Sequence, residues 1–115
     1  MKSMLASVLV LISVALLAQN IPVNPNVTDV KGLRQGIWTI CFNEKWKVTS
    51  NIDSIIYYRI IEYKNDKPVG VVKGYYKSGV LQMEASFIAD RPKAIIDQSK
   101  PSRFFSESGQ PVIAA

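Results

Sequence analysis

The chain has 115 residues, and 14 lysines and arginines against 9 acids give it a formal net charge of +5 at pH 7. It contains no histidine and only one cysteine, which removes the commonest general base, most zinc sites and any disulfide within the chain. The basic residues are dispersed among acids instead of gathered in a run, a pattern typical of a solvated surface, so we expect no nucleic-acid partner.

The first 18 residues have the composition of a signal peptide. Lys2 supplies the positive start, Met4 to Leu17 the apolar stretch, and Ala15 to Ala18 the small residues near a cleavage point. We predict a signal-peptide helix that is cleaved after Ala18, so that the membrane is contacted only during export. An uncleaved anchor is the alternative, but the stretch is short for a bilayer and no cluster of basic residues flanks it.

Residues 19–28 form the next segment, an extended lead-in with two prolines and no periodicity. Residues 29–115 are expected to form one small domain. Its first strand has Trp38, Ile40 and Phe42 on one face. Cys41 alternates with them, so its expected role is that of a small buried side chain and not of a reactive thiol.

The segment Ser54 to Tyr63 is β-branched or aromatic almost throughout, which predicts a strand that is apolar on both faces. A turn at Asn51–Asp53 is expected to precede it. We expect this strand in the centre of the sheet, because a bare edge of such composition promotes aggregation. The alternative is an exposed edge that pairs with a partner.

The segment Val80 to Phe87 alternates apolar and polar residues, which is the period of a half-buried strand. Its apolar face carries Leu81, Met83, Ala85 and Phe87. Ser78-Gly79 before it is typical of a tight hairpin turn, where glycine supplies a positive φ. Ala94–Ile96 starts another short strand. No segment after the signal peptide has helical spacing, so the fold is expected to be nearly all β.

A short segment occurs twice in this chain. Tyr63, Asp66, Lys67 and Pro68 return as Phe87, Asp90, Arg91 and Pro92. An aromatic residue followed by acid, base and proline is typical of a strand that ends in a turn, so the recurrence indicates a repeated strand-turn unit. In such turns, Asp66 and Asp90 are expected to accept hydrogen bonds from backbone amides.

These residues resemble the MORN repeat variant family, whose short bacterial repeats have a YY-x-x-G-x-L core and an x-x-G-K/R-P-x-G linker. The core is matched by Tyr75, Tyr76, Gly79 and Leu81, and the linker by Asp66, Lys67, Pro68 and Gly70. The resemblance covers roughly residues 29 to 113, with one clean copy in the middle. It implies an antiparallel sheet of repeated β-hairpins. Many members of the family are labelled antitoxins of toxin–antitoxin systems.

The chemistry-bearing residues give little support to catalysis. The acids are separated in the sequence, although two could still converge for glycoside hydrolysis, and a pocket lined by Asp53, Glu62 and Glu84 would support that alternative. The glycines at 70, 74 and 79 are spaced for strand entry and a hairpin turn and do not make a phosphate loop. We therefore expect no enzyme, no cofactor and no metal.

Aromatic side chains are the remaining candidates for function, and the binding residues proposed from the sequence are Trp46, Tyr58, Tyr75 and Tyr76. Trp46 lies in a polar turn between two lysines, so we expect it to be exposed. For each of the other rings the alternative is that it covers a thin core.

The expected function is that of an exported, non-enzymatic module that binds a protein, a cell-envelope polymer or a second copy of itself. Its expected location is the periplasm, the outer membrane surface or the extracellular space. The alternatives are a small acid-dependent hydrolase and an antitoxin-type inhibitor of a co-encoded toxin.

Overall fold

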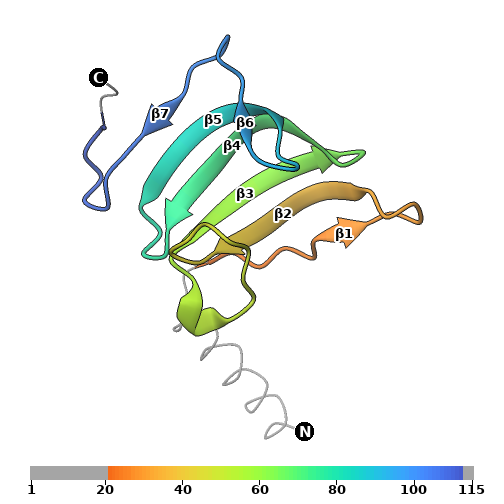
Figure 1. The fold of residues 1–115 in the computed structure, drawn as a ribbon, viewed down its shortest axis with the longest axis horizontal. Coiled ribbons are helices and arrows are strands. Elements are labelled where there is room, and N and C mark those ends of the chain that lie inside the picture. The colour runs from red at the N-terminus through yellow and green to blue at the C-terminus, as the bar shows by residue number, and fades with distance from the viewer. Residues whose placement is uncertain (1–20, 113–115) are drawn as a thin grey trace, which may run out of the picture.

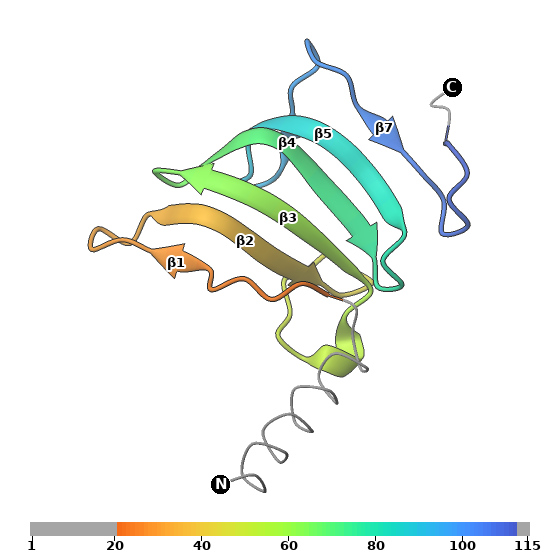
Figure 2. The ribbon, with the colours of Figure 1, turned by 180° about the vertical axis from the view of Figure 1, so that it is seen from behind.

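The computed structural model describes residues 21–112, so the predicted signal peptide and its cleavage point lie outside the described part. Within it the chain is all β, as predicted, and forms an antiparallel sheet (Figures 1 and 2). Its strands are β1 (Val27–Thr28), β2 (Arg34–Phe42), β3 (Tyr57–Lys64), β4 (Lys67–Tyr76), β5 (Leu81–Ala89), β6 (Ile95–Ile96) and β7 (Arg103–Phe104). One 3-10 helix, η1 (Ile52–Ser54), precedes β3.

Strands that follow one another in the chain lie side by side in the sheet, in the order β1-β2-β3-β4-β5-β6. β3 is therefore an interior strand, which confirms the central position predicted for the segment rich in isoleucine and tyrosine. β6 and β7 both pair with β5, where Ile96 lies opposite Phe87 and Phe104 lies opposite Met83. These two short strands thus share the outer edge of β5 (Figure 1).

β3 begins at Tyr57, three residues later than the sequence pattern predicts. The side chain of Asn51 accepts a hydrogen bond from the backbone N–H of Asp53 and caps η1, so the preceding residues form a helical turn. After this turn Ile55 returns to extended backbone and is buried, with 4 % of its surface exposed. The local cap therefore prevails over the β propensity of the isoleucines.

The turn between β4 and β5 is the tight hairpin expected at Ser78-Gly79. The backbone N–H of Tyr76 donates to the carbonyl of Val80 at 2.9 Å, and that of Gly79 donates to the carbonyl of Tyr76 at 2.8 Å. Gly79 has a φ of +94°, which a residue with a β-carbon adopts only with strain.

The sheet carries apolar packing on both faces. The larger cluster consists of Ile61, Tyr63, Val72, Met83, Ala85 and Phe87, and includes most of the apolar face predicted for β5. The smaller cluster, on the other face, consists of Ile21, Ile55 and Tyr58. Cys41 is half-buried against the smaller cluster, and burial raises the pKa of its thiol, as suits an inert packing residue.

Candidate functional site

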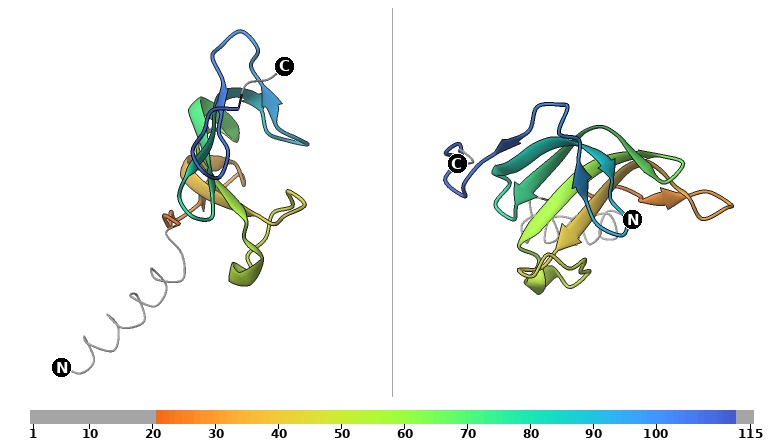
Figure 3. Two further views of the ribbon diagram at one scale, coloured as in Figure 1. Left: turned by 90° about the vertical axis from the view of Figure 1, so that its left-hand side faces the viewer. Right: turned by 45° about the horizontal axis from the view of Figure 1, so that its top comes forward.

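An open pocket of about 960 Å³, called the groove below, lies on the face of the larger core cluster. β2 and β3 form its floor, and the segments 43–50 and 90–94 rise beside it; seen edge-on, both segments project from the same side of the sheet (Figure 3). The lining consists of Asn26, Arg34, residues 38–42, Trp46, residues 48–50, Arg59, Ile61 and residues 90–94.

One end of the groove is aromatic. The ring of Trp46 stacks on Tyr57 with centroids 3.9 Å apart and planes 7° apart, and Phe42 lies 5.6 Å from Trp46. A tight turn holds the indole there, because Asn43 Oδ1 accepts hydrogen bonds from the backbone N–H groups of Lys45 and Lys47. Trp46 remains 39 % exposed, which agrees with the exposure predicted for it.

Arg59 lies beside these rings, in the middle of the sheet. Its guanidinium carbon is 5.0 Å from the centroids of Phe42 and Trp46 and 5.5 Å from that of Phe87. Its Nε is buried and has no hydrogen-bond partner among residues 21–112. Burial lowers the pKa of Arg59, and the electrostatic effects of Tyr63 and Asp90 offset this only in part.

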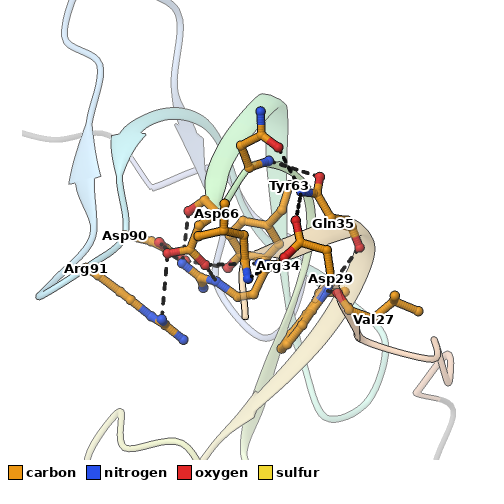
Figure 4. Close-up of polar contacts among 11 residues, drawn as sticks. Val27, Asp29, Arg34, Gln35, Tyr63, Asp66, Asp90 and Arg91 are labelled. Carbon is orange, nitrogen blue, oxygen red and sulfur yellow. Dashed lines mark hydrogen bonds and ion pairs between the residues drawn. The ribbon is translucent and has the colours of Figure 1, made fainter. Parts of the chain in front are cut away.

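A second buried arginine, Arg34, is fully paired (Figure 4). Its Nε donates to Asp66 Oδ1 at 2.6 Å, and its two terminal nitrogens donate to the two carboxylate oxygens of Asp90, each at 2.9 Å. The guanidinium also lies 4.0 Å above the ring of Tyr63, whose hydroxyl donates to Asp90. We call Arg34, Tyr63, Asp66 and Asp90 the arginine clamp.

The arginine clamp is an arrangement of ions that is stable at neutral pH. Burial alone would lower the pKa of Arg34, but the hydrogen bonds to Asp90 and Asp66 outweigh it and raise that pKa. The same contacts with Arg34 lower the pKa of Asp66. Burial and the hydrogen bond to Asp90 raise the pKa of Tyr63, so its phenol stays neutral.

The four aromatic residues proposed from the sequence do not form one site. Trp46 and Tyr76 lie on the groove side, where the Tyr76 hydroxyl donates to the carbonyl of Phe105 at 2.7 Å. Tyr58 and Tyr75 stack on each other on the opposite side, 5.0 Å apart. Tyr58 is 3 % exposed and belongs to the core, so it is not available as a contact residue.

The acids named for a hydrolytic alternative are also separated. Asp53 lines a smaller pocket with Glu44, Glu62 is exposed on β3, and Glu84 pairs with Arg103. Asp90 is the one carboxylate in the lining of the groove within the described part of the chain, and Arg34 and Tyr63 occupy it. Asp66 accepts from the backbone N–H of Arg34 at 3.3 Å, as the turn pattern predicted, as well as from its side chain. Asp90 binds the side chains of Arg34 and Tyr63 instead of the predicted backbone amides.

Residues 21–112 contain no group of three or more cysteines and acids placed to hold a metal ion. No helix in this range has both the length and the apolar character that a membrane crossing requires.

Sequence reasoning missed the two buried arginines. A signal for Arg59 was present, since it shares one strand face with Tyr57, Ile61 and Tyr63, where a charge is out of place. Arg34 had no such signal, because its burial depends on residues far away in the sequence.

No family model, curated protein or solved structure matches the chain.

Proposed function

We propose that the chain is an exported, non-enzymatic binding module of the MORN repeat variant type, which holds a segment of a partner protein or cell-envelope polymer in the groove. The observation that carries this proposal is the exposed indole of Trp46, fixed by stacking on Tyr57 beside the unpaired guanidinium of Arg59. Tryptophan, tyrosine and arginine are the residues most enriched among those that dominate binding energy.

The groove is ready for binding without rearrangement. Trp46 is held by its turn and by Tyr57, so little side-chain entropy is lost when a ligand covers it. The arginine clamp anchors the neighbouring wall, because Asp90 begins the segment 90–94 and binds Arg34 at two points. A fixed wall and a fixed ring are typical of preformed ligand sites.

Export and the repeat family remain part of the proposal on grounds of sequence. The composition of residues 1–18 supports export, and the repeated segment supports the family. The two aspartates of that segment, Asp66 and Asp90, also bind one arginine, which supports treating them as equivalent positions in adjacent repeats.

The two alternatives have less support. Hydrolysis by paired carboxylates needs two free acids across a cleft, and the groove offers Asp90 alone among the described residues. Inhibition of a toxin is a special case of binding, and export argues against a target in the cytosol.

Export is tested by deleting residues 2–18 and following the protein in cell fractions. We expect the intact chain outside the cytosol in its shortened form and the deletion variant inside. Intact chain that stays in the cytosol at full length contradicts export.

Binding in the groove is tested by affinity capture with residues 19–115 as bait. Trp46→Ala removes the exposed ring of the groove, and Val71→Ser is the matched control, since Val71 is 57 % exposed on the opposite face. We expect a partner that the wild type and Val71→Ser retain and Trp46→Ala loses. Equal retention by all three proteins contradicts the groove as the binding surface.

A further inference from the structure

We infer that Arg59 is a subsite for a carboxylate, and that the groove takes an acidic side chain or a carboxyl terminus of a peptide together with an apolar neighbour. The inference rests on the proposed function and specifies the ligand chemistry of the same groove. It begins from the contrast between two buried arginines on one face of the sheet. Arg34 has all its donor nitrogens paired, whereas Arg59 has no hydrogen bond or ion pair within residues 21–112.

The orphaned position of Arg59 carries an energetic penalty. A guanidinium that is partly removed from water needs an anion or several acceptors in return, and cation–π contacts with three rings replace only part of its hydration. Proteins usually pair such a group, so one that faces a pocket without a partner is a candidate ligand site. A bound carboxylate would accept from the two terminal nitrogens of Arg59, in the two-point geometry that Asp90 makes with Arg34, and its charge would offset the burial of the guanidinium.

A second orphaned polar atom lies close to the same arginine. Gln82 Oε1 is buried without a hydrogen-bond partner among the described residues. A β-carbon on Gly74 would lie 3.1 Å from this oxygen and 3.6 Å from Arg59 Cγ. Both side chains therefore extend over Gly74, which has no side chain of its own.

The charge of the lining favours an anion. Arg34, Arg59, Arg91 and Lys93 contribute positive charge to the groove, and they are opposed by Asp90 in its lining and by Asp66 beside it. Arg91 forms a long ion pair with Asp66 at 3.7 Å, but its side chain is 65 % exposed, so a ligand can reach it. These rim charges attract acidic partners, and Arg59 provides the desolvated contact.

The remaining lining favours a peptide over an acidic sugar. Trp38, Ile40, Phe42, Val48 and Ile61 supply apolar surface for a neighbouring side chain. Sugar hydroxyl groups instead need planar polar side chains with free hydrogen-bonding capacity. Asp90 is occupied by Arg34, and the amide of Asn26 is bound to the backbone of Thr39.

The test is a titration of labelled residues 19–115, followed by NMR signals of the Trp46 indole and of groove amides. The probes are N-acetylphenylalanine, with a free carboxylate, its uncharged amide, and N-acetylmuramic acid as the sugar-borne carboxylate. We expect the free acid to bind at least about tenfold more tightly than its amide, since the bonds to a charged group are lost in the amide. The same preference should disappear in Arg59→Met, which keeps the apolar stem, and persist in the exposed control Arg103→Met.

Each other result overturns the inference in a distinguishable way. Equal binding of acid and amide, both lost in Trp46→Ala, would leave groove binding standing and remove the carboxylate subsite. Tighter binding of N-acetylmuramic acid than of N-acetylphenylalanine would replace the peptide with a sugar acid. No change of the Trp46 indole signal with any probe would remove the subsite, and the affinity capture with Trp46→Ala would then decide separately whether the groove binds a larger partner.

Discussion

Arg34 and Asp90 lie 56 positions apart in the chain and form a two-point ion pair, each nitrogen to oxygen distance being 2.9 Å. Asp66 binds the remaining Nε of the same guanidinium at 2.6 Å (Figure 4). The pair therefore joins the start of β2 to the end of β5, which are not neighbours in the sheet. It also fixes the first residue of the segment that forms one wall of the groove.

Replacing Arg34 tests how much this ion pair stabilises the fold. Arg34→Met keeps an apolar stem but leaves Asp90 and Asp66 without their cation, and we expect the free energy of unfolding to fall by about 3 kcal/mol or more. Urea unfolding followed by tryptophan fluorescence measures it. Arg103→Met is the control, because Arg103 pairs with Glu84 at the surface and should contribute less than about 1 kcal/mol. Equal losses in the two variants would contradict a buried structural role for the arginine clamp.

The fall in the free energy of unfolding at acid pH should depend on Asp66. Its contact with Arg34 lowers its pKa in the folded state, whereas in the unfolded chain the pKa of an aspartate is about 3.9. Its contribution is therefore present above about pH 4 and is lost as the pH falls through the lower folded pKa. We expect Asp66→Asn to flatten the decline of unfolding free energy between about pH 4 and pH 2.

The matched variant for that pH series is Asp97→Asn. Hydrogen bonds from Ser99 also lower the pKa of Asp97, but this acid lies in an exposed loop away from Arg34. At neutral pH, Asp97→Asn should reduce stability less than Asp66→Asn does, because the bonds from Ser99 are exposed to solvent. A wild-type slope in Asp66→Asn would show that the fall at acid pH is set elsewhere.

The strands could be predicted from sequence because alternation and β propensity act locally. Met83, Ala85 and Phe87 are buried as their spacing requires, and the densely apolar β3 occupies the interior of the sheet. The start of β3 was predicted too early, since the cap at Asn51 outweighs the propensity of the residues that follow it.

The candidate site depends on contacts that spacing does not reveal. The pairing of Trp46 with Tyr57 requires the turn at Asn43 to fold back over the sheet, and the burial of Arg59 requires Phe87 from β5. Composition identified Trp46 as exposed because two lysines flank it. Alternation places Tyr75 and Tyr76 on opposite faces of β4, but it does not show which face carries the groove.

The turn between β4 and β5 offers a test of local conformation. Gly79 has a φ of +94° and open space where a β-carbon would stand, so Gly79→Ala introduces backbone strain without a clash. We expect the free energy of unfolding to fall by about 1 kcal/mol. Gly74→Ala differs, because Gly74 has no positive φ and its β-carbon would meet Gln82 and Met83. Thermal unfolding of both variants checks this, and an unchanged midpoint for Gly79→Ala would contradict the strain.

Replacing Arg59 with methionine should raise the free energy of unfolding, whereas Arg34→Met lowers it. Arg59→Met removes a desolvated charge whose Nε has no hydrogen-bond partner among the described residues, and methionine fills much of the same volume among Phe42, Trp46 and Phe87. The lost cation–π contacts oppose this gain by about 0.5–2 kcal/mol. We expect a net rise in the free energy of unfolding of about 1 kcal/mol, which for a domain of this size raises the midpoint by about 4–8 °C.

Differential scanning calorimetry of the wild type, Arg59→Met and Arg34→Met at one pH measures this contrast. A residue retained for binding at the expense of stability is recognised by a variant that melts higher and binds less. If Arg59→Met instead melts several degrees lower, as Arg34→Met should, then Arg59 is a structural residue whose charge the fold itself satisfies. In that case Arg59 would not be a ligand site.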